Sequence, residues 1–246
     1  MATIEREWGY FGYQITKAPI MCGRYSVVID EAKLREQFTR DLFTPTNALV
    51  KNYNVAPTQR NPVITNADPD RLNLFRWGLV PFWAKDLKIG ARMINARREG
   101  IEDKPSFRKA IRERRCLVVA DSFYEWQRKD GKKYPHRIFP ADGSLLVMAG
   151  IWETWKDKND PDAEAVHTYS IITGAPNAEM EPLHDRMPML LQQTDLQNAW
   201  LDDSTSLAGV KDLLRTPPDG TLTAYPVSAM VGNVRNNGAE LHERVG

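Results

Sequence analysis

The sequence predicts an α+β fold: a single domain built on a central, mostly antiparallel β-sheet or barrel with a few peripheral helices. Turn signals rich in Gly, Pro, Asn and Asp recur about every 8–15 residues along the chain. Between them lie short runs of β-branched and aromatic residues, which favour strands, and far fewer stretches with helical periodicity. Because strands outnumber helices and do not alternate with them regularly, a mixed antiparallel sheet is expected.

Each expected element is a run of suitable residues bounded by turn formers. Strands are expected where Val, Ile, Leu and aromatic residues cluster, at 25–29, 61–65, 71–75, 117–121, 123–127, 136–139, 145–152, 168–173 and 224–227. Helices are expected at 31–38, 105–114, 194–200 and 206–214, and Asp30 is suited to cap the first of them. We also expect the stretches 130–140 and 144–152 to pair as neighbouring strands around a turn.

Composition limits the functional classes. The chain has 246 residues and can bury a substantial core. Lys plus Arg number 33 and Asp plus Glu number 32, so the net charge of +1 excludes a polycation that binds through bulk charge. No stretch approaches the roughly 18 consecutive apolar residues of a membrane span, and no membrane partner is expected. The two cysteines, Cys22 and Cys116, cannot form a disulfide framework, so a cytoplasmic protein is expected.

The charge is distributed unevenly along the chain. Residues 92–115 carry nine Lys and Arg against four acids, whereas residues 153–185 carry eight acids against two lysines. Two interpretations fit the basic segment, which is either a solvated helix or a face that binds phosphates. A local basic groove is therefore compatible with the neutral total.

Three polar residues interrupt apolar runs in which a strand core is expected. Asn95 follows Met-Ile, Glu125 lies between Phe-Tyr and Trp, and His184 follows a leucine. Burial raises the pKa of a carboxyl group and suits it to acid–base work near neutral pH. The alternatives are an outward-facing Glu125 and a structural His184. The four histidines show no i,i+4 pairing, so neither a metal site nor a cofactor is expected.

Aromatic residues gather around a glycine near the middle of the chain. Residues 75–83 read FRWGLVPFW and contain four large rings beside Arg76. Most tryptophans in a domain belong to its core. Aromatic rings beside arginines are also typical of single-stranded nucleic acid binding, in which bases stack on rings and phosphates pair with Arg. Both interpretations remain open at this point.

Seven short motifs follow one another in order along the chain. They lie at 21–25 (MCGRY), 53–57 (YNVAP), 76–83 (RWGLVPFW), 94–97 (INAR), 120–126 (ADSFYEW), 183–188 (LHDRMP) and 226–233 (PVSAMVGN). This series resembles the SRAP (SOS response-associated peptidase) family over about residues 21–240. The resemblance implies an SRAP-type α+β domain at residues 22–246, preceded by a leader at 1–21.

The resemblance implies a protein of the DNA damage response that senses abasic sites in single-stranded DNA and shields them. Family members crosslink to the lesion through an amino-terminal cysteine. An opened abasic sugar presents an aldehyde, which an amino-terminal cysteine captures twice, first with its amine and then with its thiol, to close a thiazolidine ring. The α-amine has a pKa of about 7.7–8.0, against about 10.4 for lysine, so far more of it is neutral at pH 7. The thiol must also lose its proton.

The resemblance also assigns residues to roles. Cys22 is the nucleophile, Asn95 positions it or the sugar, Glu125 moves protons, and His184 acts as acid or base on the opened sugar. Autoproteolysis and strand scission by an AP-lyase reaction are implied as associated activities. The DNA-binding residues implied are Arg24, Arg97 and Arg186, which hold phosphates, together with Trp83, which wedges or stacks bases, and Pro57. Cys116 matches no catalytic position and is expected to be a small buried residue.

The leader departs from the family pattern. Members begin at the methionine before the cysteine, whereas here twenty residues precede Met21. While they are attached, Cys22 has an amide nitrogen and cannot form a Schiff base. Three explanations remain: Met21 is the true initiator, the leader is a propeptide that the protein removes itself, or the leader is retained and prevents crosslinking.

The protein is expected to be a monomer. Two other functions are alternatives to covalent capture of abasic sites. The first is a cysteine peptidase that uses Cys22 as nucleophile and His184 as base. The second is a non-covalent reader of damaged or modified DNA, motivated by the basic segment and the aromatic rings, and it becomes the preferred function if the leader is retained.

Overall fold

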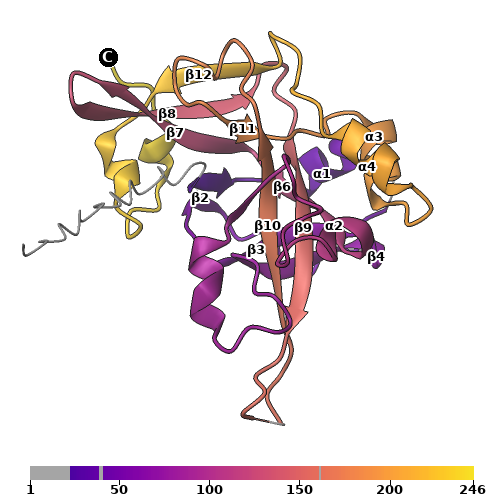
Figure 1. Ribbon diagram of the computed structural model, residues 1–246. Coiled ribbons are helices and arrows are strands. Elements are labelled where there is room, and N and C mark those ends of the chain that lie inside the picture. The colour runs from indigo at the N-terminus through magenta and orange to yellow at the C-terminus, as the bar shows by residue number, and fades with distance from the viewer. Residues whose placement is uncertain (1–22, 39–40, 161) are drawn as a thin grey trace, which may run out of the picture.

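Two β-sheets carry the fold in the computed structural model, which describes residues 23–38, 41–160 and 162–246 (Figure 1). The first is an antiparallel sheet of five strands in the order β12-β8-β7-β1-β2. Its strands are β12 (Leu222–Pro226), β8 (Lys132–Pro140), β7 (Ser122–Lys129), β1 (Tyr25–Val27) and β2 (Asn52–Val55).

The second sheet closes into a barrel. Its strands follow the order β11-β10-β4-β3-β6-β9, and β9 pairs again with β10, while β5 pairs with β10 outside this path. All pairs are antiparallel except β10 with β4 and β10 with β5. The strands are β3 (Arg60–Thr65), β4 (Asp68–Trp77), β5 (Asn95–Arg97), β6 (Arg115–Ala120), β9 (Leu146–Trp155), β10 (Val166–Gly174) and β11 (Met187–Pro188).

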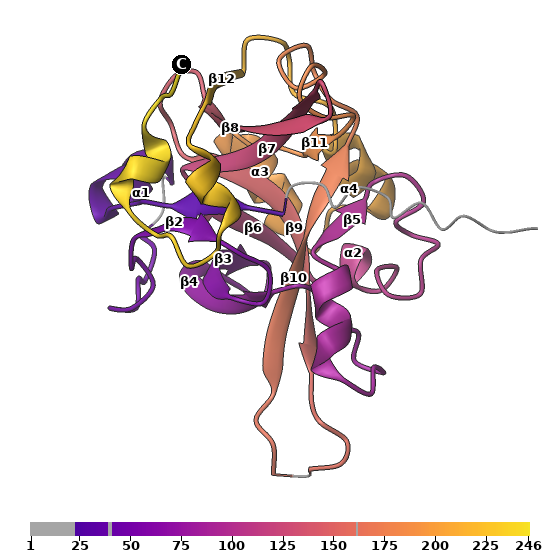
Figure 2. The same cartoon turned by 90° about the vertical axis from the view of Figure 1, so that its left-hand side faces the viewer.

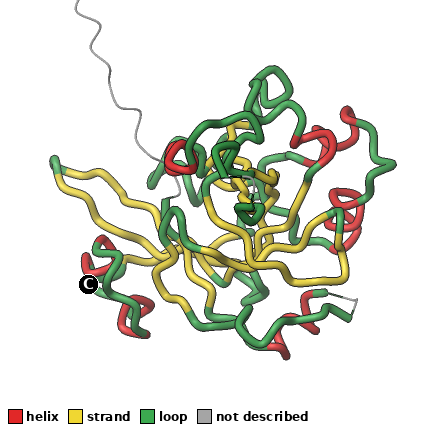
Figure 3. Tube along the Cα trace, turned by 90° about the horizontal axis from the view of Figure 1, so that it is seen from below, coloured by secondary structure: helices red, strands yellow, loops and turns green. Residues whose placement is uncertain are grey.

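Short helices lie around the outside of the strands (Figure 3). They are α1 (Glu31–Gln37), α2 (Ala110–Glu113), α3 (Thr194–Leu201) and α4 (Leu207–Leu213), with 3-10 turns at Leu87–Arg92, Ala229–Gly232 and Ala239–His242. Asp30 caps α1 by accepting a hydrogen bond from the backbone N–H of Lys33. In the described part of the chain, no helix combines the length and the hydrophobicity that crossing a membrane requires.

One hydrophobic core joins the two sheets. Residues of β1 pack in it together with residues of β3, β6, β9 and β10. The ring of Tyr25 in β1 meets Trp77 of β4 edge-on at 4.9 Å, and the two hydroxyl groups of Tyr25 and Tyr169 form a hydrogen bond inside the barrel. These contacts hold β1 against the barrel, because both an aromatic pair and a buried hydroxyl hydrogen bond need the two side chains in close contact.

The predicted fold class is confirmed, and each of the nine predicted strands lies on an observed strand. Three short strands, β2, β5 and β11, were not predicted, since two to four residues carry too little periodicity. The helix predicted at 105–114 is reduced to Ala110–Glu113, with turns before it.

The pairing predicted for residues 130–140 with 144–152 is wrong. Strand β8 instead pairs with β7, and β9 pairs with β6 and β10. Asp130 and Gly131 form the two-residue turn between β7 and β8, both with positive φ, at 51° and 71°. Such a turn matches the twist of a tight hairpin, so the chain turns back there and then crosses to the barrel. The hairpin of β9 and β10 extends away from the barrel (Figure 2).

Candidate functional site

A pocket of about 410 Å³ brings several of the predicted site residues together. It lies where the beginning of the described chain meets β7 and the loop before β11. We call it the Glu125 pocket. It is lined by Gly23, Arg24, Pro57, Glu125, Trp126, Arg128, Lys133, His184 and Gly232.

Glu125 is the buried carboxylate of this pocket. Its residue is only 3% exposed, and its position in β7 pairs with His136 of β8. The neighbouring Tyr124 is fully buried, and its hydroxyl donates to the carbonyl of Tyr53. The outward-facing alternative for Glu125 is therefore wrong, and the strand holds this carboxylate away from bulk water.

His184 lies in the loop between β10 and β11, with its side chain 13% exposed. Burial is the main cause that lowers the pKa of His184, assisted by the charges of Arg128 and Arg186 and opposed by Asp185. The Nδ1 atom lies 2.8 Å from an oxygen of Asp185 and 3.2 Å from the backbone nitrogen of Arg186. The first contact suits a protonated Nδ1 and the second an unprotonated one, so the two contacts favour different protonation forms of the ring.

The chain enters the pocket along β7. The backbone N–H of Tyr124 donates to the carbonyl of Arg24, which places Gly23 beside Glu125. Cys22 itself lies outside the described residues. The residue that follows it is therefore part of the same pocket as Glu125 and His184.

Asn95 is not among the residues that line the Glu125 pocket. It begins β5, is half-buried, and pairs in parallel with Ile171 of β10. The carbonyl of Ile94 accepts hydrogen bonds from the Trp77 indole and from the backbone of Ile171, which fixes the start of β5. The end of β10 links β5 to the loop of His184, because Thr173 pairs with Arg97 and its carbonyl accepts from Arg186.

The three predicted phosphate-binding arginines differ in what they already contact. Arg186 donates from Nη2 to Glu99 and to the carbonyl of Thr173, both at 2.7 Å. Arg24 donates from Nη1 to Asn54 at 2.8 Å and to the carbonyl of Val231 at 2.9 Å, and burial lowers its pKa.

Arg97 differs from both of these arginines. It is exposed and has no ion pair within the described part of the chain. Of the three guanidinium groups, that of Arg97 is the most available to a phosphate.

The aromatic cluster is divided between core and surface. Trp77 is fully buried and Phe75 is 7% exposed, whereas Phe82 and Trp83 are 51% and 43% exposed. The ammonium group of Lys109 lies 5.6 Å from the centre of the Phe82 ring. Trp83 is therefore open to stacking, but it does not line the Glu125 pocket. Pro57, by contrast, lines it.

The basic segment 92–115 is partly committed to internal contacts. Arg115 is fully buried and donates to the carbonyls of Trp200 and Asp202. Arg114 forms an ion pair at 2.8 Å with the buried Glu153. The interpretation as one solvated helix is wrong, since α2 covers four residues only. The exposed cations of the segment that form no ion pair with a described residue are Arg92, Arg97, Lys104, Arg108 and Arg112.

Comparisons with known proteins decide the family. The family model described as SOS response associated peptidase (SRAP) matches residues 21–234. The chain belongs to the SRAP family. A Bacillus subtilis (strain 168) protein named abasic site processing protein YoqW is 42% identical over 226 residues, which cover 91% of this chain and 99% of its own length.

More distant relatives agree with this assignment. The mouse protein named abasic site processing protein HMCES is 34% identical over 77% of this chain and 64% of its own length. A crystal structure of a Bacteroides thetaiotaomicron protein superimposes with a TM-score of 0.78 at 27% identity, covering 91% of this chain and 100% of that one. The SRAP fold of this chain is thereby established.

Sequence reasoning missed two cations that line the Glu125 pocket, Arg128 and Lys133. The run Arg-Lys-Asp-Gly-Lys-Lys at 128–133 was the available signal, but only the lining of the folded pocket shows which of its cations belong to it. Cys116 lies fully buried in β6, and burial raises the pKa of its thiol far above the usual range, so this thiol is unreactive. Among the described residues, no three His, Cys, Asp or Glu side chains gather as a metal site requires.

Proposed function

We propose that this SRAP protein captures abasic sites in single-stranded DNA covalently, with Cys22 as the first residue of the mature chain. The observation that carries the proposal is the Glu125 pocket, in which Gly23 lies together with a buried carboxylate and a partly buried imidazole. The relatives named abasic site processing proteins support the lesion as the substrate. The family match, which begins one residue before Cys22, supports the position of the nucleophile.

The reaction balances with the loss of one water molecule. The α-amine of Cys22 adds to the C1′ aldehyde of the opened sugar, and the resulting carbinolamine loses water to give a Schiff base. The thiolate then adds to the imine carbon, and the nitrogen takes up a proton. A carbon–nitrogen and a carbon–sulfur bond form, the aldehyde oxygen leaves as water, and a five-membered thiazolidine ring closes.

The pocket supplies groups suited to these proton transfers. A carbinolamine loses water only after its oxygen is protonated, a step that we assign to the carboxyl group of Glu125. His184 is neutral at pH 7 because its pKa is lowered, so it is suited to act on the sugar hydroxyl during ring opening. Asn95, fixed at the start of β5, is suited to position the sugar or the amine through its side-chain amide.

Two exposed side chains outside the pocket lining suit an unpaired strand. We assign Arg97 to a backbone phosphate and Trp83 to stacking on a base, because the first is exposed without an ion pair to a described residue and the second is partly exposed. We assign Pro57 to DNA binding as well, because it lines the pocket. Arg24 and Arg186 have one nitrogen each committed to protein acceptors, so they contribute to phosphate binding only through their remaining donors.

Removal of residues 1–21 is a precondition of the proposed chemistry. Hydrolysis of the bond between Met21 and Cys22 by the protein itself fits the description of the family as a peptidase. Strand scission by β-elimination from the Schiff base is a second associated activity that we propose. His184 takes up the C2′ proton, a C2′–C3′ double bond forms, and the 3′ phosphate leaves with the downstream strand.

A denaturing gel tests the proposed function. The chain beginning at Cys22 is mixed with a single strand that contains one abasic site, and a slowly migrating species is expected. The same chain with Cys22→Ala, and the chain that retains residues 1–21, are expected to give none. A strand carrying a tetrahydrofuran in place of the sugar controls for the aldehyde. A crosslink that survives Cys22→Ala contradicts the proposal, and peptide cleavage without DNA favours the peptidase instead.

A further inference from the structure

The hairpin of β7 and β8 places four cations within six residues. Arg128 pairs with Lys133, and Lys129 pairs with Lys132, on either side of the turn at Asp130 and Gly131. All four cations are exposed. Adjacent positions of a strand point to opposite faces of the hairpin, so the register divides the four charges into two pairs.

Only one of these pairs belongs to the site. Arg128 and Lys133 line the Glu125 pocket, whereas Lys129 and Lys132 do not. Arg128 is close enough to His184 for its charge to contribute to the lowered pKa of the imidazole. Arg128 therefore acts electrostatically on His184, and Lys133, its directly paired neighbour, lines the same pocket.

The pocket-facing pair is also available to a ligand. Neither Arg128 nor Lys133 forms an ion pair with any residue that the structure describes, and neither side chain donates a hydrogen bond there. Arg186, in the same loop as His184, instead forms an ion pair with Glu99 at 2.7 Å. Two uncompensated cations at the mouth of a pocket favour an anionic ligand.

We propose that Arg128 and Lys133 bind the backbone phosphates on one side of the abasic nucleotide. The inference rests on the proposed function, since it assigns a second DNA contact to the same pocket. A lesion in the Glu125 pocket has a phosphate at each of its two neighbours along the strand. Arg128 and Lys133 are directly paired next to the turn of one hairpin, so both charges act on the same short stretch of DNA backbone. We expect that stretch to lie on one side of the lesion.

The hairpin offers a control that is matched in charge. Binding of a fluorescent abasic strand is measured by anisotropy in the Cys22→Ala background, so that no adduct traps the complex. We expect Arg128→Gln with Lys133→Gln to weaken binding about tenfold. We expect Lys129→Gln with Lys132→Gln, which removes the same charge, to weaken it by less than twofold. The salt dependence falls by about 0.7 in log–log slope for each phosphate contact that is lost.

The side of the lesion is tested with strands of different length. The strand is shortened from its 5′ end or from its 3′ end, and both double variants are measured on each. We expect the tenfold effect of the pocket-facing pair to disappear on one shortened strand and to persist on the other. Equal effects of the two double variants, or equal effects on both shortened strands, overturn the inference. Crosslinking by the unmodified Cys22 chain reports separately on the proposed function.

Discussion

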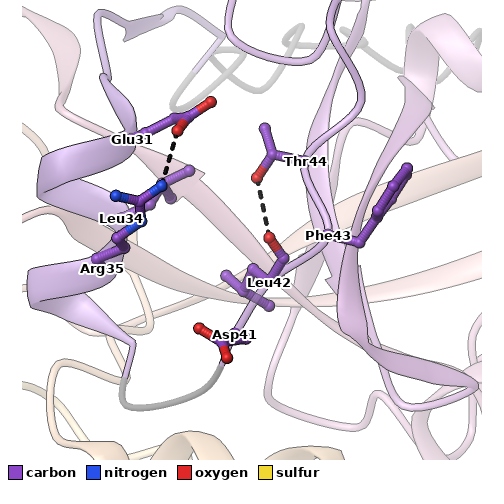
Figure 4. A pocket seen from close by; sticks show the side chains of 7 residues that line it. All are labelled: Glu31, Leu34, Arg35, Asp41, Leu42, Phe43 and Thr44. Atoms are coloured by element: carbon purple, nitrogen blue, oxygen red, sulfur yellow. Dashed lines mark hydrogen bonds and ion pairs between the residues drawn. The ribbon is translucent and has the colours of Figure 1, made fainter.

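Two pockets of this protein differ in what their charged side chains already contact. The Glu125 pocket combines a carboxylate that is 3% exposed with an imidazole whose pKa burial has lowered. A second pocket of about 260 Å³, which we call the α1 pocket, lies between α1 and residues 41–44 (Figure 4). There Arg35 and Glu31 form an ion pair at 3.0 Å along the helix, with side chains 76% and 64% exposed.

The difference shows why a hollow alone does not make a reactive site. The charges of Glu31 and Arg35 in the α1 pocket are solvated and pair with one another one helical turn apart. In the Glu125 pocket, strand β7 and the His184 loop take an acid and a base out of water. Desolvation shifts the free energy of protonation, and that shift is what acid–base chemistry requires.

The largest effect is expected from Glu125→Gln. This change keeps the shape of the side chain but removes the transferable proton, so the crosslinking rate is expected to fall about 10²- to 10⁴-fold. Arg35→Ala in the α1 pocket is the control and leaves the rate unchanged. Single-turnover rates, with thermal melting to check the fold, measure both. A Glu125→Gln rate within twofold of the wild-type value contradicts this role.

Substitutions around His184 are expected to move the pH profile of crosslinking. Because its pKa lies below the ordinary 6.5, the imidazole stays neutral until the pH falls through that lowered value. Asp185 raises this pKa, so Asp185→Asn shifts the acid limb of the rate profile to lower pH. Arg128 lowers it, so Arg128→Gln shifts the limb to higher pH. If the acid limbs of the rate profiles are the same in Asp185→Asn and Arg128→Gln, His184 is not the group whose protonation limits crosslinking.

Two exposed aromatic rings, those of Trp83 and Phe43, provide a third test. Trp83→Ala is expected to weaken binding of a single strand by about 5- to 150-fold, since stacking of one base contributes about 1–3 kcal/mol. Phe43 in the α1 pocket is 59% exposed and is packed under Arg71, 4.6 Å from its ring centre. Phe43→Ala is expected to leave binding unchanged in the same anisotropy titration. Equal losses of DNA binding in the two variants contradict the role of Trp83, because they show that any exposed ring contributes nonspecific apolar contact.

The smallest effects are expected at α1 and concern stability alone. Asp30→Ala removes the cap bond to Lys33 and is expected to cost about 1 kcal/mol in the free energy of unfolding. Arg35→Ala removes an exposed i,i+4 pair and is expected to cost about 0.3–0.5 kcal/mol. Urea titration measures both, and crosslinking rates stay at the wild-type value. A loss of rate in either variant shows that α1 supports the site.

Local patterns predicted the long strands of the fold, but not how those strands associate. Runs such as 145–152 are apolar enough to be recognised as strands from the sequence alone. Strand β5, by contrast, has only three residues and forms through its pairing with β10. The crossing of the chain from β8 to β9 depends on the barrel closing between β9 and β10, which no local window contains.

The sequence predicted which residues take part in the candidate site better than it predicted what their side chains contact. The motif resemblance selected Glu125 and His184, which line one pocket. The neutralisation of Arg186 by Glu99 joins residues 87 positions apart, and the buried hydrogen bonds of Arg115 reach α3. A count of charges in the segment 92–115 could not distinguish cations that contact protein groups from exposed cations that form no ion pair with a described residue. Arg128 and Lys133 were overlooked because composition alone does not show which cations of the run 128–133 line the pocket.

Intact mass spectrometry of the crosslinking reaction tests the central claim most directly. The chain beginning at Cys22 is incubated with an abasic single strand without any reductant, and the products are weighed and fragmented. Covalent capture predicts one species whose mass is the sum of protein and DNA less one water, with the DNA on the first residue. Unmodified masses alone, or an adduct on a lysine, contradict it.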